Sequence, residues 1–177
     1  TPFEHNSVTF RVPAPIFVFR EWHRHRIQSY NEQSGRYTVF QPNFYVPGKD
    51  RPLLNIGSSA RPEMGEIDPA IQDRFIADLI EGYESQWARY ENAIEAGIAN
   101  EMARLHLPVS IMSTMYATAN LRAWLHFIGL RTTDARATHK GRPQAEIVMA
   151  AAQVEEYLND LFPITMEAFN KNGRVAP

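Results

Sequence analysis

A chain of 177 residues that is 44% hydrophobic and 21% charged can bury a core without disulfides or a metal, and it is too apolar to be disordered. Eighteen Lys and Arg against 20 Asp and Glu give a formal charge of −2, which excludes a global basic field for holding a nucleic-acid polymer. The absence of cysteine excludes disulfides, thiolate metal sites and cysteine nucleophiles.

Membrane and export signals are also absent from the sequence. No apolar run approaches the roughly 20 residues that cross a bilayer, and the first residues lack the order of a signal peptide. We therefore expect a cytoplasmic protein with no membrane partner. Because residue 1 is Thr and leads directly into a strand-like run, we also expect the sequence to begin inside a longer protein.

The first 35 residues predict a strand, a helix and a loop. Apolar residues alternate with polar ones over residues 7–12, which predicts a strand that Pro13 and Pro15 close. Helical spacing then predicts a short helix over residues 15–23, with proline in its first turn. The polar composition of residues 27–35 indicates a loop.

The middle of the chain contains the clearest helix signal. Two short strand-like pieces at 37–40 and 43–46 precede a connection rich in Pro, Gly and Ser at 48–64. Apolar residues then recur at helical steps from residue 68 to residue 98, and Asp68 followed by proline supplies an N-cap. This segment predicts one long helix.

The last part of the chain predicts one further strand between helices. A short helix over 100–106 precedes a strand with β-branched and aromatic residues over 109–118. A helix over 120–130, a loop over 132–142 and a last long helix over 143–161 complete the prediction.

An unusual basic cluster follows the first predicted helix. Although the chain is slightly acidic, a short stretch contains four arginines and two histidines: Arg20, His23, Arg24, His25, Arg26 and Arg36. Arginine forks bind phosphate oxygens in pairs, and Ser34 and Gly35 add further donors, so one interpretation is a site for a phosphorylated small ligand. The alternative is a solvated basic face that pairs with Glu21 and Glu32.

A second polar group is weaker. Its members lie on two predicted helices and the strand between them: Arg104, Asn120, Arg122, His126 and Arg131. The last four do not share one helical face. The six histidines show no zinc spacing, so we expect no metal site. Among the tryptophans, only Trp22 lies beside the arginines and suggests a nucleobase contact.

The basic cluster also carries a family signature. Residues 24–37 read RHRIQSYNEQSGRY, which resembles the signature of the flavin-dependent thymidylate synthases. Other segments resemble that family in the same order: TPFEH at 1–5, PAPIFVFREW at 13–22, FYVP at 44–47, ARLHLP at 103–108, TANLRAWLHFIGLR at 118–131 and Glu146-Ile147. The resemblance spans nearly the whole chain.

The resemblance implies an α+β fold in which an antiparallel sheet packs against several helices. The helical spacing adds one long central helix, and we expect one domain over residues 1–177 that lacks the family's N-terminal segment. The resemblance also implies a homotetramer with sites between subunits. The implied reaction is reductive methylation of dUMP to dTMP, with methylenetetrahydrofolate as carbon donor and NADPH as hydride source through FAD. The absence of cysteine from the sequence agrees with this reaction, because this family needs no cysteine nucleophile.

Site residues follow from the resemblance position by position. The positions that match the family's FAD contacts are Thr1, Arg24, His25, Arg26, Glu32, Asn120, Arg122 and His126. The positions that match its dUMP contacts are Glu21, Trp22, His23, Arg24, Gln33, Ser34, Gly35, Arg36, Arg104 and Arg131. The resemblance implies that Ser34 and Arg36 serve the phosphate and that Arg131 polarises the pyrimidine as the catalytic residue.

Three features depart from the family pattern. Glu21 stands where glutamine is usual, which places a carboxylate near an anionic nucleotide and weakens binding unless an arginine neutralises it. The family's segment before TPFEH, with further FAD contacts, is absent from this sequence. Residues 132–145 are longer than the common connection, which leaves the role of His139 open.

Two other classes of function stay open at this point. A catalytically inactive module that kept the arginine cluster would bind a nucleotide or nucleic acid without turnover. A purely structural fragment would do neither.

Overall fold

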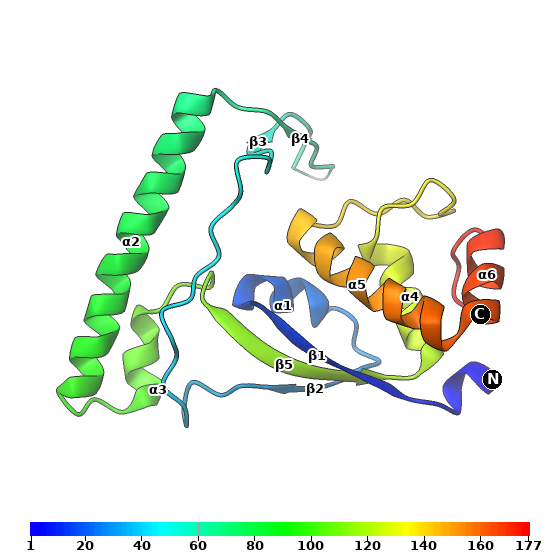
Figure 1. Cartoon of the computed structure of the whole chain (residues 1–177), viewed down its shortest axis with the longest axis horizontal. Helices are drawn as coiled ribbons and strands as arrows, with labels where there is room; N and C mark the ends of the chain where they lie inside the picture. Colours follow the sequence, from blue (N-terminus) through cyan, green and yellow to red (C-terminus); the bar gives the residue numbers. More distant parts are fainter. Residues whose placement is uncertain (60) are drawn as a thin grey trace. The chain divides into compact units, whose positions relative to one another are not determined.

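The computed structural model describes residues 1–59 and 61–177, and their contacts group into two compact units. Unit 1 comprises residues 1–12, 18–32 and 114–177, and unit 2 comprises residues 13–17 and 33–113. A small antiparallel sheet and several helices, one of them long, confirm the α+β class (Figure 1).

The sheet has three strands in the order β1-β5-β2: β1 spans Val8–Pro15, β5 spans Met112–Ala119 and β2 spans Ser29–Glu32. β2 runs antiparallel to β5, with Ser29 opposite Thr118. The hydroxyl oxygens of Thr9 on β1 and Thr118 lie 2.8 Å apart. The strand predicted at 109–118 from its β-branched and aromatic residues is confirmed by β5, in which every second residue is buried.

Two predictions for the first 35 residues were wrong. Pro13 and Pro15 do not close the first strand, because β1 continues through Pro15. Since β1 is an edge strand in the described sheet, a residue without an N–H can lie on its open side. The predicted loop at 27–35 contains β2, because pairing with β5 provides hydrogen bonds that the local composition does not reveal.

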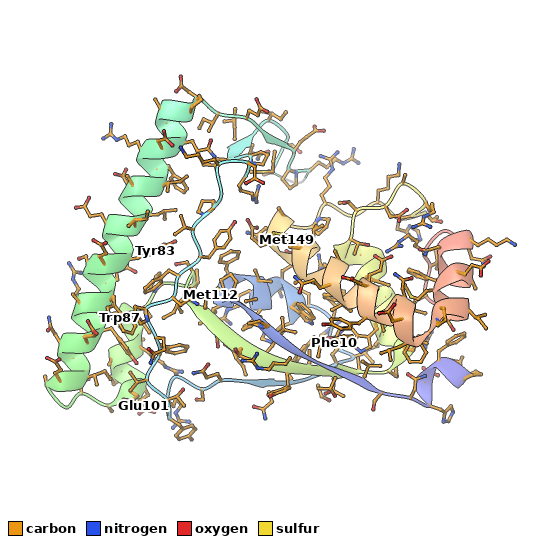
Figure 2. All side chains as sticks on the ribbon, viewed as in Figure 1. Phe10, Tyr83, Trp87, Glu101, Met112 and Met149 are labelled. Carbon is orange, nitrogen blue, oxygen red and sulfur yellow. The ribbon has the colours of Figure 1, made fainter. Side chains whose placement is uncertain are left out.

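Helices of unit 1 lie on one side of the sheet in Figure 1: α4 spans Leu121–Arg131, α5 spans Ala145–Leu161 and α6 spans Pro163–Lys171. The sequence predicted α4 and α5 but missed α6, whose short apolar pattern buries only Met166 and Phe169. A 3-10 turn, η1, spans Pro2–Glu4. Phe10 of β1, labelled in Figure 2, meets the Trp124 ring edge-on at 5.0 Å.

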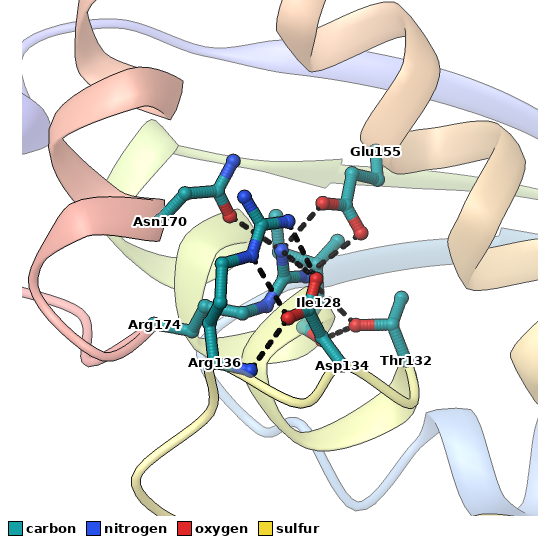
Figure 3. Close-up of polar contacts among 7 residues, drawn as sticks. All are labelled: Ile128, Thr132, Asp134, Arg136, Glu155, Asn170 and Arg174. Atoms are coloured by element: carbon teal, nitrogen blue, oxygen red, sulfur yellow. Dashed lines mark hydrogen bonds and ion pairs between the residues drawn. The ribbon is translucent and has the colours of Figure 1, made fainter.

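An ionic network around the buried Arg174, here called the Arg174 cluster, connects the loop after α4 with α5 and α6 (Figure 3). It contains Thr132, Asp134, Arg136, Glu155, Asn170 and Arg174. Both terminal nitrogens of Arg174 donate to the Glu155 carboxylate, at 2.6 and 2.7 Å, and one also donates to Asn170 at 2.6 Å. Arg174 further donates to Thr132 Oγ1 at 2.8 Å. The network therefore holds the start of the loop after α4 against α5 and α6.

The backbone around Arg174 is fitted closely to α4. Arg174 has a φ of 57°, in the left-handed region that costs roughly 1–2 kcal/mol for a residue with a side chain. A Cβ on Gly129 of α4 would lie 2.8 Å from the Arg174 carbonyl oxygen, so only glycine allows this approach.

Unit 2 is organised by a long helix, α2, over Pro69–Glu95. Asp68 caps it by accepting a hydrogen bond from Ala70 N at 2.8 Å, as the sequence predicted. Tyr83 stacks on Phe44 with ring centroids 4.9 Å apart, and Trp87 follows it along α2 (Figure 2). Shorter elements complete the unit: α3 over Asn100–Ala103, the 3-10 turn η2 over Arg104–His106, β3 over Leu54–Asn55 and β4 over Met64–Gly65.

The two predicted strands at 37–40 and 43–46 were wrong. Residues 34–38 form a turn in which the Ser34 carbonyl accepts from Tyr37 N and Thr38 N, both at 3.1 Å. Residues 43–46 contribute only an isolated bridge between Phe44 and Ile111. The connection at 48–64 contains β3 and the first residue of β4, and its residue 60 lies outside the described residues.

No helix among residues 1–59 and 61–177 is long and apolar enough to cross a membrane.

Candidate active site

The basic motif begins where the first helix of the chain ends. This helix, α1, spans Ile16–Trp22, and its last residue is buried against Phe127 of α4 at a ring distance of 4.3 Å. Tyr30 of β2 donates its hydroxyl to the carbonyl of His25 at 2.6 Å and to that of Trp22 at 3.3 Å. Burial raises the pKa of Tyr30 to about 12, so the hydroxyl keeps its proton and ties the helix end to the sheet.

Three side chains form what we call the Arg131 cluster: Glu21, His25 and Arg131. Arg131 Nη1 lies 2.5 Å from the Glu21 carboxylate, and Arg131 Nε donates to His25 Nε2 at 2.9 Å. Their side chains are largely enclosed, with 19% of Arg131 and 23% of Glu21 exposed. Among the described residues Arg131 Nη2 has no hydrogen-bond partner, so it can donate to a ligand.

The electrostatics keep His25 neutral. Its side chain is buried, and burial, Arg131 and His126, in that order, lower the pKa of His25 to about 4. The neutral ring can accept the Arg131 hydrogen bond at Nε2, which requires its proton to be on Nδ1. The cluster therefore has one negative, one positive and one uncharged member.

A cavity of about 370 Å³ opens beside this cluster in unit 1. It is lined by Glu4, Arg24, His25, Arg26, Ile27, Gln28, Asn120, Arg122, Ala123, His126, Ala176 and Pro177. Arg24 and Arg26 are exposed and make no ion pair with any described residue, whereas Arg122 pairs with Glu4 at 2.9 Å. Two unpaired guanidinium groups at a concave surface suit an anionic ligand.

α4 supplies the other wall of the cavity. Asn120 is its N-cap and accepts from Ala123 N at 2.9 Å, which holds the helix start in place. Arg122 and His126 are four residues apart and therefore lie on the same face. Three polar residues of α4 and its cap, Asn120, Arg122 and His126, line the cavity, whereas Arg131 does not.

The structure thus unites six of the predicted FAD residues and leaves two apart. Thr1 and Glu32 do not line the cavity, and their roles stay predictions. Gln28 was not among the residues predicted from the sequence, and its Oε1 accepts from Trp22 Nε1 at 3.0 Å. Since an indole nitrogen only donates, this bond fixes the amide orientation, and Gln28 Nε2 is buried without a described partner. Its position two residues after the basic triplet is the only sequence signal for it.

Predicted dUMP residues fall into both units. Glu21, Trp22, His23, Arg24 and Arg131 belong to unit 1, whereas residues 33–36 and Arg104 belong to unit 2. The Trp22 ring is fully enclosed in the core. Burial lowers the pKa of His23, and its Nε2 has no described partner.

In unit 2 the loop 33–36 lies against Arg104. A Cβ on Gly35 would come within 2.4 Å of the Phe40 ring and 3.3 Å of Arg104 Cδ, so this position needs glycine. Arg36 Nε binds the Glu101 carboxylate at 3.0 Å, and Arg104 Nε donates to the Glu101 carbonyl at 3.4 Å. Two arginines with one carboxylate leave an excess of positive charge next to the Ser34 hydroxyl and suit a phosphate.

Comparison with known proteins decides the family. The family described as thymidylate synthase complementing protein matches residues 1–164. A flavin-dependent thymidylate synthase of Streptomyces avermitilis is 46% identical over the whole chain, which covers 72% of that protein, and one of Streptomyces coelicolor is 47% identical with the same coverage. This chain belongs to the flavin-dependent thymidylate synthases. Its similarity to a Tropheryma whipplei member, at 43% identity over the whole chain, agrees.

Two solved structures of a similar protein agree with this chain in fold. PolB from Streptomyces cacaoi, described as a UMP/dUMP methylase, is 42% identical and covers the whole chain. Its structure with 5-Br UMP superposes with a TM-score of 0.96, with 78% of that chain covered, and its structure with 5-Br dUMP gives 0.91 with 77% covered.

The residues present fit the flavin that the family uses. The two unpaired guanidinium groups of Arg24 and Arg26 suit the charged part of a flavin nucleotide, and the buried donor of Gln28 lacks a partner that a bound ligand can supply. The charge of the cavity and its unpaired amide donor are therefore compatible with a flavin nucleotide.

Proposed function

We propose that this enzyme converts dUMP to dTMP by reductive methylation, with methylenetetrahydrofolate as carbon donor and NADPH as hydride source. The cavity with the unpaired Arg24 and Arg26 carries the proposal, since it provides an anion site beside Arg131. FAD is the proposed flavin, and when bound it supplies the reducing equivalents of the reaction. The 42% sequence identity to PolB, which is described as a UMP/dUMP methylase, supports the nucleotide substrate.

The chain's own residues have separate tasks in this proposal. Arg24, Arg26, Asn120, Arg122 and His126 hold FAD, since all five line the cavity. Gln28 adds its amide donor there. Thr1 and Glu32 stay proposed contacts on the basis of the family resemblance alone.

The nucleotide would use two groups of residues. Ser34, Gly35, Arg36 and Arg104 bind the phosphate, because the loop and the two arginines already lie together in unit 2. Arg131 donates from Nη2 to a carbonyl of the pyrimidine ring, which withdraws electron density from the ring when the new bond forms. Glu21, His23, Arg24 and Gln33 complete the proposed contact set with Trp22, whose fully enclosed ring leaves only its main chain for a contact.

We further propose that the working unit is a cytoplasmic homotetramer in which different subunits contribute these groups to one site. An isolated subunit would then bind nucleotide weakly and turn over none. Measuring activity against oligomeric state by light scattering checks this, and an active monomer would contradict it.

Tritium release from C5 of dUMP, with methylenetetrahydrofolate, NADPH and FAD present, tests the reaction. We expect release that depends on all four compounds, and a purified protein that shows flavin absorbance. A protein that binds dUMP but releases no tritium would be an inactive binding module, and one that takes up no FAD would overturn the proposal.

UMP is a second candidate substrate. PolB, 42% identical to this chain, is described as a methylase of both UMP and dUMP. The same assay with UMP compares the two nucleotides directly.

A further inference from the structure

Arg131 is the last residue of α4, at a helix end that is open to fraying. The last carbonyl groups of a helix have no N–H partner within the helix, so the final turn loosens unless other groups hold it. The place that Arg131 Nη2 can reach on a ligand therefore depends on what fixes this turn.

A hydroxyl on the first residue after α4 holds the turn. Thr132 Oγ1 donates to the carbonyl oxygen of Ile128 at 2.6 Å, and Thr132 N donates to the same oxygen at 3.1 Å. Because the hydroxyl proton is used in this way, Thr132 Oγ1 is left to accept from Arg174 Nη2 at 2.8 Å (Figure 3). A continuous chain of hydrogen bonds thus leads from the last turn of α4 to the Arg174 guanidinium.

Two close approaches of the backbone hold the next two residues of the turn. A Cβ on Gly129 would lie 2.8 Å from the Arg174 carbonyl oxygen, so the chain after α6 packs directly on α4. A Cβ on Gly141 would lie 2.9 Å from the Leu130 carbonyl oxygen, so the loop before α5 packs on the same turn. The three residues that precede Arg131 are therefore each held by a segment outside the helix.

Arg174 is itself fixed by further contacts. Its side chain has no exposure, and it binds Glu155 of α5 with both terminal nitrogens and Asn170 of α6 with one. A buried ion pair is often no more stabilising than apolar side chains of the same volume, so stability alone does not account for an arginine here. An apolar side chain has no donor to direct at the Thr132 hydroxyl.

From these contacts we infer that Thr132 is a positioning residue for Arg131, and that the buried Arg174 acts through Thr132 on the last turn of α4. The inference rests on the proposed function, because it takes Arg131 to donate to the pyrimidine ring. Neither Thr132 nor Arg174 lines the cavity that contains Arg24 and Arg26, so both act through Arg131 and not on a ligand there. A misplacement of a catalytic group by about 1 Å costs up to about 10²-fold in rate.

Thr132→Val tests the hydroxyl, because valine keeps the branched shape of the side chain and removes only the hydrogen bonds. Arg174 Nη2 keeps its bond to Glu155, so the rest of the cluster stays paired. In the tritium-release assay with the FAD-loaded full chain we expect kcat to fall about tenfold. The affinity for FAD, measured by flavin fluorescence, should not change. Thr132→Ser, which restores a hydroxyl, should recover most of kcat.

A double-mutant cycle shows whether the loss goes through Arg131. In a protein that already carries Arg131→Ala, assayed at higher enzyme concentration, Thr132→Val should cause no further fall in tritium release. Asn170→Ala is the matched control, because it removes another hydrogen bond of Arg174 without touching Thr132. We expect Asn170→Ala and Thr132→Val each to lower the Tm by about 2–4 °C, but only Thr132→Val to lower kcat.

The possible failures of the inference and of the proposed function can be told apart. An unchanged kcat in Thr132→Val, or an equal fall in turnover with and without the Arg131 side chain, would show that the hydroxyl does not position Arg131. A wild type that releases tritium would then leave the proposed function intact. A wild type that releases none would overturn the proposed function and the inference together.

Discussion

Arg174 and Arg131 both lie in unit 1 and both bind a carboxylate, but their guanidinium groups are used differently. The Arg174 side chain has no exposure, and its terminal nitrogens bind Glu155, Asn170, Thr132 and Asp134. Arg131 remains partly exposed and keeps Nη2 without a described partner. A guanidinium with its terminal donors used stabilises the fold, whereas one with a donor left over can bind a ligand.

Removing Arg174 should give the largest effect on stability. Arg174→Ala leaves Glu155 enclosed without its cation, so we expect the free energy of unfolding to fall by about 3–5 kcal/mol. Urea denaturation at neutral pH measures the change. Arg136→Ala, which removes a more exposed partner of Asp134, should cost less than about 1 kcal/mol. Equal losses for the two variants would contradict the structural role of Arg174.

Removing Arg131 should affect activity far more than stability. Arg131→Ala removes the proposed donor to the pyrimidine, so we expect turnover to fall by about 10²–10³-fold. The free energy of unfolding should fall by about 1–2 kcal/mol, less than for Arg174→Ala, because Arg131 is 19% exposed and pairs with one carboxylate, whereas Arg174 is fully buried and pairs with two. Tritium release and urea denaturation of the same preparations measure both. Arg89→Ala on the exposed surface of α2 is the control, and unchanged turnover of Arg131→Ala would remove Arg131 from the site.

The two clusters should also respond to acid in different pH ranges. In the unfolded chain His25 binds a proton near its ordinary pKa of 6.5, but in the folded protein its pKa is about 4. Protonation therefore favours unfolding, and the stabilisation, full above pH 6.5, is lost as the pH falls toward 4, by on the order of 2–3 kcal/mol. His23, whose pKa burial also lowers, adds to this slope.

Asp134 in the Arg174 cluster behaves as a carboxylate. Its hydrogen bonds from Arg136, above all, hold its pKa well below the ordinary value of 3.8, so its contribution to stability is lost only at pH values below 3.8.

Denaturation curves between pH 7 and 4.5 on wild type, His25→Gln and His23→Gln isolate the contribution of the histidines. An unchanged slope in both variants would show that neither histidine is responsible.

The smallest expected effect concerns the helix caps of the two units. Asn120→Ala and Asp68→Ala each remove a side chain that accepts a backbone N–H at a helix start, so each should lower the free energy of unfolding by about 1 kcal/mol. Only Asn120 lines the cavity, so only Asn120→Ala should weaken FAD binding, measured by flavin fluorescence. Equal FAD affinity for both variants would contradict a role for Asn120 in the cavity.

Prediction from the sequence succeeded where the signal is local. The helical spacing after Asp68 predicted α2, and the alternation of apolar residues predicted β1, because both patterns follow from burial of one face. The β-branched and aromatic residues of 109–118 predicted β5. It failed at β2, whose polar residues become a strand only through pairing with β5. It also failed at α6, where two buried side chains are too few to form a visible period.

For the site, the sequence by itself determined which residues carry positive charge and, through the motif at 24–37, the family. The charges and the motif depend only on which residues follow one another in the chain, so they can be recognised without the fold. Only the tertiary structure decided which arginines are neutralised. Arg131 binds Glu21, which lies 110 positions earlier in the chain, whereas Arg24 and Arg26 meet no carboxylate in the described chain. Ion pairing depends on distances between atoms, and these are fixed by the packing of α1 against α4.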